Sequence, residues 1–251
     1  WRLADAPGRD VRRAQSYLAQ DLDVLEEVYD GFAGPLTLPL AGPWTLAAAV
    51  ELPGGERLVR DPGAVRDLAA SWIEAAAALC ASVGRRVPRA RVALQADEPA
   101  LPAVLAGAIP TASGRHRYRA VDAAAVRDAW RAAVAGLDVP VAVHCCAADV
   151  PFSLLRESGV AAISYDPALQ ADAVDEELGE CIDANVRLVV GSVEHGVAET
   201  EGPCFGADMQ RDEAFAFRAD VVAAIQLQQA RAGIAVAHHQ ALNRFIIQQR
   251  Y

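Results

Sequence analysis

The sequence predicts an α/β fold with a parallel sheet, of the (β/α)8 barrel type, and three observations favour this class. Short apolar segments alternate with longer amphipathic ones, which is typical of strands and helices that take turns along a chain. The apolar segments are nearly continuous, as in a parallel sheet buried on both faces. Polar residues follow successive predicted strands, where barrels carry their functional groups, and the sequence contains no G-x-G-x-x-G turn or P-loop.

The first half of the chain contains two long predicted helices and two predicted strands. Helices are expected at residues 10–32 and 61–83, and strands at residues 35–40 and 91–95. In the first helix, apolar residues recur at three- and four-residue spacing, with Asp10 as the expected N-cap and Gly31 as the expected stop. Pro62 falls in the first turn of the second helix. Backbone N–H groups there have no partner within the helix, so the N–H that proline lacks costs no hydrogen bond.

The same alternation continues in the second half. Helices are expected at residues 122–135, 151–157 and 172–184, and strands at residues 139–143, 161–165 and 187–190. Glutamine becomes frequent beyond residue 206, where a helix is expected at 211–232 and a strand at 234–237. We therefore expect a partial barrel core, residues 1–206, and an atypical Gln-rich helical tail, residues 207–251. About six strands are fewer than the eight of a closed barrel, so the barrel is incomplete unless the tail or a partner chain completes it.

Composition narrows the class of protein. With 251 residues and 53% hydrophobic residues, the chain can bury a sizeable core. Its net charge of −10, with no basic face, argues against a nucleic-acid partner. No apolar run approaches the roughly 20 residues of a membrane-spanning helix, and the first residues do not have the order of a secretory signal. We therefore expect a cytoplasmic protein without a membrane partner. An odd number of cysteines, 5, argues against a disulfide scaffold.

His144-Cys145-Cys146 follows the strand expected at residues 139–143. Side chains two apart in a strand point to the same side, so His144 and Cys146 could reach one ion while Cys145 faces away. An imidazole with a thiolate suits zinc, which takes nitrogen and sulfur ligands. Bound zinc would hold a substrate thiol as a thiolate at neutral pH. The alternative is a buried histidine beside two inert cysteines.

Asp97-Glu98-Pro99 ends another predicted strand. Paired carboxylates at such a position could bind a substrate ammonium group or act in proton transfer. The alternative is helix capping, with Asp97 as the N-cap ahead of Pro99 and the apolar run at residues 101–105.

Two further residues follow predicted strands. Asp166 ends the strand expected at residues 161–165 and could be an oxygen ligand or a cap for the next helix. His195 lies just past the strand expected at residues 187–190 and could be a general acid or base, because imidazole titrates near neutrality. The alternative for His195 is a solvated loop residue.

Three of these segments resemble the C-terminal barrel of the cobalamin-independent methionine synthase family. Gly42-Pro43-Trp44-Thr45 resembles its Gly-Pro-x-Thr turn, residues 95–101 resemble its Gln-x-Asp-Glu-Pro-Ala-Leu segment, and residues 144–146 resemble its His-x-Cys zinc motif. Residues 109–114 are similar to a stretch in short, barrel-only actinobacterial relatives. The resemblance covers about residues 1–192 and implies a barrel of the type that this family shares with uroporphyrinogen decarboxylase.

The resemblance also implies roles for individual residues. In that family, zinc binds the thiol of homocysteine, and the thiolate attacks the methyl group of a methyl-folate. The implied site comprises His144, Cys146 and Asp166 near the metal, Asp97 at the homocysteine amino group, Glu98 and Trp44 as further substrate contacts, and His195 as proton donor.

The sequence departs from the family in its last part. The family's final zinc ligand is a cysteine in a Pro-x-Cys-Gly segment, whereas this chain has Pro203-Cys204-Phe205. His238 or His239 could substitute for that ligand.

The leading hypothesis from the sequence is a zinc-dependent methyltransferase. It would transfer a methyl group from a methyl-folate or a corrinoid protein to homocysteine or a similar small thiol. Two alternatives remain open: a uroporphyrinogen-decarboxylase-like enzyme, which would need no zinc and would use arginines to bind substrate carboxylates, and a non-catalytic barrel homologue.

Overall fold

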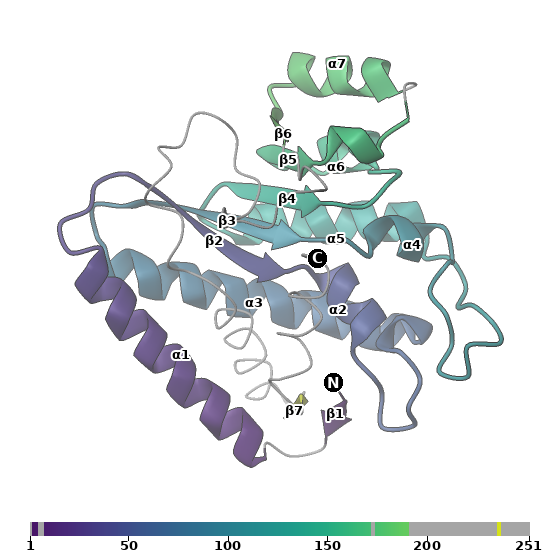
Figure 1. The fold of residues 1–251 in the computed structure, drawn as a ribbon, viewed down its shortest axis with the longest axis horizontal. Helices are drawn as coiled ribbons and strands as arrows, with labels where there is room; N and C mark the ends of the chain where they lie inside the picture. The colour runs from purple at the N-terminus through teal and green to yellow at the C-terminus, as the bar shows by residue number, and fades with distance from the viewer. Residues whose placement is uncertain (1, 5–7, 172–173, 191–234, 237–251) are drawn as a thin grey trace.

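The computed structural model describes residues 2–4, 8–171, 174–190 and 235–236. Its centre is a five-stranded parallel sheet, which confirms the predicted α/β class (Figure 1). The strands are β2 (Pro35–Ala41), β3 (Arg91–Asp97), β4 (Val141–Cys145), β5 (Ala162–Tyr165) and β6 (Arg187–Val190). Within the described part of the chain the sheet is open, with β2 and β6 at its edges, so closure into a barrel stays a prediction.

The strands lie side by side in chain order, β2-β3-β4-β5-β6, without the reversal that marks a doubly wound sheet. The connecting helices are α3 (Pro62–Arg86), α5 (Ala123–Gly136), α6 (Phe152–Glu157) and α7 (Asp175–Asp183). Because parallel crossovers are right-handed, strands that follow in one direction carry their crossover helices on one face. Accordingly, α3 packs on α5, α5 on α6 and α6 on α7, in one continuous layer (Figure 1).

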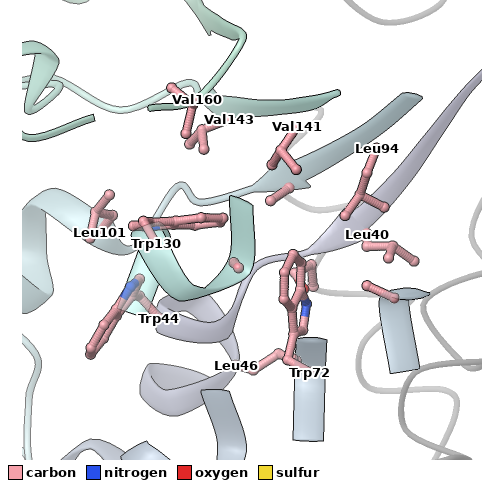
Figure 2. Close-up of a cluster of buried hydrophobic side chains, with 14 of the residues drawn as sticks. Leu40, Trp44, Leu46, Trp72, Leu94, Leu101, Trp130, Val141, Val143 and Val160 are labelled. Atoms are coloured by element: carbon pink, nitrogen blue, oxygen red, sulfur yellow. The ribbon is translucent and has the colours of Figure 1, made fainter. Parts of the chain in front are cut away.

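The main hydrophobic core lies between this helix layer and one face of the sheet (Figure 2). Leu40, Leu94 and Val143 project from three neighbouring strands and are almost fully buried. Trp72 of α3 and Trp130 of α5 pack edge to face, with their ring centroids 5.7 Å apart. The strands therefore bury alternate residues against the helices, and the residues between them are left for the opposite face.

The predicted helix starts agree with the structure, to within one residue, where an aspartate side chain caps the helix. Asp61 precedes α3 and accepts hydrogen bonds from the N–H groups of Gly63 and Ala64 at 2.8 and 3.1 Å. Asp122 does the same for α5. The prediction was wrong for the first helix, α1 (Arg9–Val28), because Gly8 occupies the N-cap position instead of Asp10. This helix also ends before Gly31, which adopts a positive φ of 72°.

Several short elements were not predicted. They are α2 (Pro43–Ala49) and the single turns η1 (Leu58–Arg60) and η2 (Pro167–Leu169), whereas α4 (Leu101–Leu105) covers the apolar run for which a helix was the stated alternative. The strand expected at residues 234–237 is the short β7 (Ala235–Val236), which pairs antiparallel with β1 (Leu3–Ala4). Completion of the barrel by the tail stays a prediction. The helix expected at residues 211–232 lies outside the described residues. Within the described residues, no helix combines the length and apolar character needed to cross a membrane.

Candidate metal- and substrate-binding site

A row of polar side chains lies at the carboxyl end of the sheet. In the strand register, Asp97 of β3 pairs with His144 of β4, and His144 pairs with Ser164 of β5. Paired residues of neighbouring strands point to the same face, and the buried residues between them face the helices. Asp97, His144 and Ser164 therefore share the face opposite the helix layer. We call these three residues, with Gln95, the polar row.

Asp97 is held within this row by its own strand. The Gln95 side-chain amide donates a hydrogen bond of 2.8 Å to Asp97 Oδ1. The alternative that Asp97 caps the following helix is wrong, because α4 has Ala100 at its N-cap position and no side-chain capping bond. Its carboxylate is partly buried, lies beside His144 and is anchored by a neutral amide. A carboxylate of this kind is able to form charge-assisted hydrogen bonds with a cationic group.

Glu98, the next residue, has a different environment. Its side chain is 0% exposed. Its carboxylate accepts hydrogen bonds from Trp44 N at 3.0 Å, Thr45 N at 2.7 Å and Thr45 Oγ1 at 2.8 Å. Burial raises the pKa of Glu98 to about 8, since desolvation of the carboxylate outweighs these three bonds and the charge of Asp97 adds to the effect.

Glu98 therefore anchors the first turn of α2. Two of its bonds come from backbone N–H groups that have no partner within the helix, so the carboxylate satisfies donors that would otherwise be buried unpaired. Trp44, in the same turn, is 2% exposed and belongs to the hydrophobic core. Substrate contacts by Glu98 and Trp44 stay predictions, but in the described structure both side chains serve packing.

Ser164 was not predicted as a site residue. Its hydroxyl lies 3.1 Å from His144 Nδ1. If Nδ1 donates to Ser164, the imidazole is the tautomer whose Nε2 carries the lone pair, which is the arrangement that orients a metal-binding histidine. The signal in the sequence is weak: Ser164 is a single polar residue in an apolar strand, two residues before Asp166. Only the register places it next to His144.

The two adjacent cysteines have different environments. Cys145 pairs with Tyr165 in the strand register, is fully buried and faces away from His144, as predicted. Burial raises the pKa of the Cys145 thiol to about 12, so this thiol is inert at neutral pH. Cys146 follows the end of β4 and is partly exposed. Of the pair, Cys146 is thus the residue that has exposed surface.

Asp166 acts as a cap, which was one of the two expectations for it. Its side chain accepts a hydrogen bond of 2.9 Å from Ala168 N and begins η2. A role as metal ligand stays a prediction. His195, the expected proton donor, lies outside the described residues, as do Cys204, His238 and His239.

The donor set fits part of a zinc site. An imidazole and a thiol follow one another at the end of β4, and both are ligand types that zinc prefers. A structural zinc site has four ligands, and a catalytic one has at least three from the protein. Within the described residues, no group of three or more His, Cys, Asp and Glu side chains is placed to hold a metal ion. Any further ligands would have to come from elsewhere in the chain or from substrate.

Comparisons with protein-family models, with curated proteins and with solved structures found no match to this chain.

Proposed function

We propose that this chain is a zinc-dependent methyltransferase of the cobalamin-independent methionine synthase type, acting on homocysteine or a similar small thiol. One observation carries the proposal. Asp97 and His144 are register partners at the carboxyl end of a parallel sheet, on the face opposite the helices, and Cys146 follows directly. An anion for a substrate ammonium group and two zinc-type ligands thus come from neighbouring strand ends.

The proposed architecture is an arc of a (β/α)8 barrel. Strands in chain order with all crossover helices on one face are the arrangement of a barrel wall. In that architecture the polar row faces the barrel interior at its carboxyl rim, which is where barrel enzymes hold their substrates. Residues beyond the described part, or a partner chain, would supply the remaining strands.

Each residue of the site then has a chemical task. His144 and Cys146 would hold the zinc, and Ser164 would orient the imidazole through Nδ1. When bound, zinc lowers the pKa of a substrate thiol and so supplies a thiolate nucleophile at neutral pH. Asp97, kept in place by Gln95, would bind the amino group of the thiol substrate and so fix its orientation toward the methyl donor. Asp166 and His195 remain proposed as third ligand and proton donor.

The methyl donor is a methyl-folate or a corrinoid protein. Direct assays with each donor and homocysteine test the proposal. We expect methionine formation that requires zinc and falls at least about 100-fold in Asp97→Asn and in His144→Ala, because each change removes a group with a separate task. The matched control is Asp138→Asn, which removes a carboxylate from the loop before β4, at the opposite end of the sheet. Activity that is unaffected by Asp97→Asn and His144→Ala would contradict the proposed site.

A second candidate function is a non-catalytic barrel homologue. The observation that favours it is that the described residues contain no group of three metal ligands. It predicts weak zinc retention and no methyl transfer with either donor. A uroporphyrinogen-decarboxylase-like enzyme, in contrast, would turn over its substrate without zinc. Zinc near one per chain in the purified protein would argue against both alternatives.

A further inference from the structure

Glu98 stands where three elements meet: the N-terminus of α2, the end of β3 and the end of β4. Its carboxylate receives the three hydrogen bonds from Trp44 and Thr45. Thr45 contributes more than one bond, because its hydroxyl donates to Glu98 and accepts a bond of 3.4 Å from Ala100 N on the other side. The side chain of Glu98 is thus tied to α2, and α2 is tied in turn to the segment after β3.

The backbone adds two bonds at the same place. Gly42 N donates to Asp97 O at 2.8 Å, and Glu98 N donates to His144 O at 2.7 Å. The first bond joins the end of β2 to Asp97, and the second joins Glu98 to His144. Asp97 and His144, the two charged or basic members of the polar row, are therefore each bonded through their carbonyl groups to this cluster.

The close fit at Gly42 shows that little movement is tolerated. A Cβ atom at position 42 would collide with the carboxyl group and Cγ of Glu98. Glycine thus allows the backbone between β2 and α2 to approach the buried carboxylate. The carboxyl group of Glu98 thus has no exposed surface, three hydrogen-bond donors and the backbone of Gly42 packed against it.

We propose that Glu98 is a positioning residue: anchored by Thr45 and α2, it fixes the ends of β3 and β4 and so sets the placement of Asp97 relative to His144. The proposal rests on the proposed function only in taking Asp97 and His144 as site residues. In this proposal the buried side chain of Glu98 acts through the backbone and not by direct contact with a substrate or a metal. Its effect on the site passes through the backbone bonds of residues 97, 98 and 144.

The test uses Thr45→Val, which keeps the shape of the side chain and removes the hydroxyl that donates to Glu98. The readout is amide hydrogen exchange of Gly42 and Glu98, whose N–H groups make the two backbone bonds, measured relative to Ala161, whose N–H bonds to Val141 O away from the cluster. We expect exchange at Gly42 and Glu98 to rise at least about tenfold relative to Ala161, and the His144 ring resonances to shift.

Two matched variants separate positioning from general destabilisation. Thr45→Ser keeps a hydroxyl donor and should restore exchange to within about twofold of wild type. Val126→Thr makes the reverse change in the core beneath α5, where Val126 is fully buried. It should speed exchange at all three amides alike. Equal ratios in Thr45→Val and Val126→Thr, or no rescue by Thr45→Ser, would overturn the proposal.

Binding of cobalt(II) to the metal-free protein tests whether the positioning by Glu98 affects the proposed metal site. If His144 and Cys146 bind the metal, wild type shows a thiolate-to-cobalt absorption band that Cys146→Ser removes. Thr45→Val should then alter the band and weaken cobalt binding about tenfold, as changes behind metal ligands do. An unchanged band and affinity in Thr45→Val would overturn the positioning role. A wild-type protein without the band would contradict the proposed function instead, and the exchange and ring-resonance results would still decide the role of Glu98.

Discussion

The two faces of the parallel sheet differ in what their side chains do. On the face under the helices, Leu94, Val143 and Ile163 are fully buried and give the fold its core. On the opposite face, their neighbours Gln95, His144 and Ser164 are polar and bonded to one another or to Asp97. One residue along each of these three strands thus changes the environment of the side chain from the apolar core to the polar face.

The same division continues past the strand ends. Asp97 and Glu98 are adjacent carboxylates, yet one belongs to the polar row and the other is sealed beneath α2. Cys145 and Cys146 differ in the same way, since only Cys146 is partly exposed. The comparison teaches that the residue type alone does not assign the role. Burial and hydrogen-bond partners do, and the variants proposed next compare residues in the two environments.

The largest expected effect is on the pH dependence of stability. The folded state raises the pKa of Glu98 to about 8 from its ordinary value of 4.5, so the folded protein binds this proton more tightly than the unfolded chain. The resulting stabilisation is fully present below about pH 4.5 and is lost as pH rises through about 8. It amounts to at most about 5 kcal/mol. Urea unfolding of wild type and Glu98→Gln from pH 5 to 9 measures it. Parallel pH profiles for the two proteins would contradict the assignment.

A substitution at Gly42 should be nearly as costly. Gly42→Ala places a Cβ against the buried Glu98 carboxyl group, so we expect a loss of about 3–4 kcal/mol in the free energy of unfolding. Gly54→Ala is the control, because an added Cβ there meets no atom within 4 Å. Urea unfolding should show little change for Gly54→Ala. Equal stabilities of the two variants would mean that the close contact at Gly42 does not exist in solution.

Ile163 and Ser164 are adjacent in β5 and lie on opposite faces of the sheet, so substitutions at these two positions compare the faces directly. Ile163→Ala should cost about 3 kcal/mol of stability, because it opens a cavity in the core, and it should leave zinc affinity unchanged. Ser164→Ala should cost about 1 kcal/mol and weaken zinc binding about tenfold, because it removes the hydroxyl that lies 3.1 Å from His144 Nδ1. Unfolding and competitive zinc titration provide both numbers. Zinc binding that is affected by Ile163→Ala but not by Ser164→Ala would reverse the assignment of the faces.

The smallest effect concerns the two cysteines. Burial raises the pKa of Cys145 to about 12, so we expect iodoacetamide at pH 8 to modify Cys146 at least about tenfold faster than Cys145. Peptide mapping by mass spectrometry gives the two rates in the same sample. Zinc should protect Cys146 and leave Cys145 unaffected. Faster modification of Cys145 than of Cys146 would contradict the burial of Cys145 on the face under the helices.

Local patterns in the sequence predicted most of the fold. The strand at residues 187–190 was predicted with its observed bounds, and Asp61 and Asp122 mark the starts of their helices through capping, which is a local interaction. The first helix was predicted with the wrong cap because Gly8 has no side-chain signal. Alternation within the strand also predicted that Cys145 faces away from His144, and the register agrees.

The arrangement around Glu98 could not be predicted in this way. It depends on contacts between residues 42–45 and residue 98, which are more than 50 positions apart and have no shared periodicity. The sequence showed two acidic residues before a proline, and capping by Asp97 was a sound local alternative. In the structure Asp97 does not cap the following helix. Instead, the neighbouring Glu98 binds the first turn of α2, a helix that precedes it in the chain. The position of Ser164 beside His144 likewise depends on the register between β4 and β5, which the sequence alone does not reveal.

The central claim is that His144 and Cys146 bind one zinc ion on the face opposite the helices. Zinc content of purified wild type, Cys146→Ser and Cys80→Ser tests it most directly, because Cys80 is a buried thiol on α3 far along the chain. We expect about one zinc per chain in wild type and in Cys80→Ser, and a clear loss in Cys146→Ser. Equal zinc in all three proteins, or none in wild type, would contradict the claim.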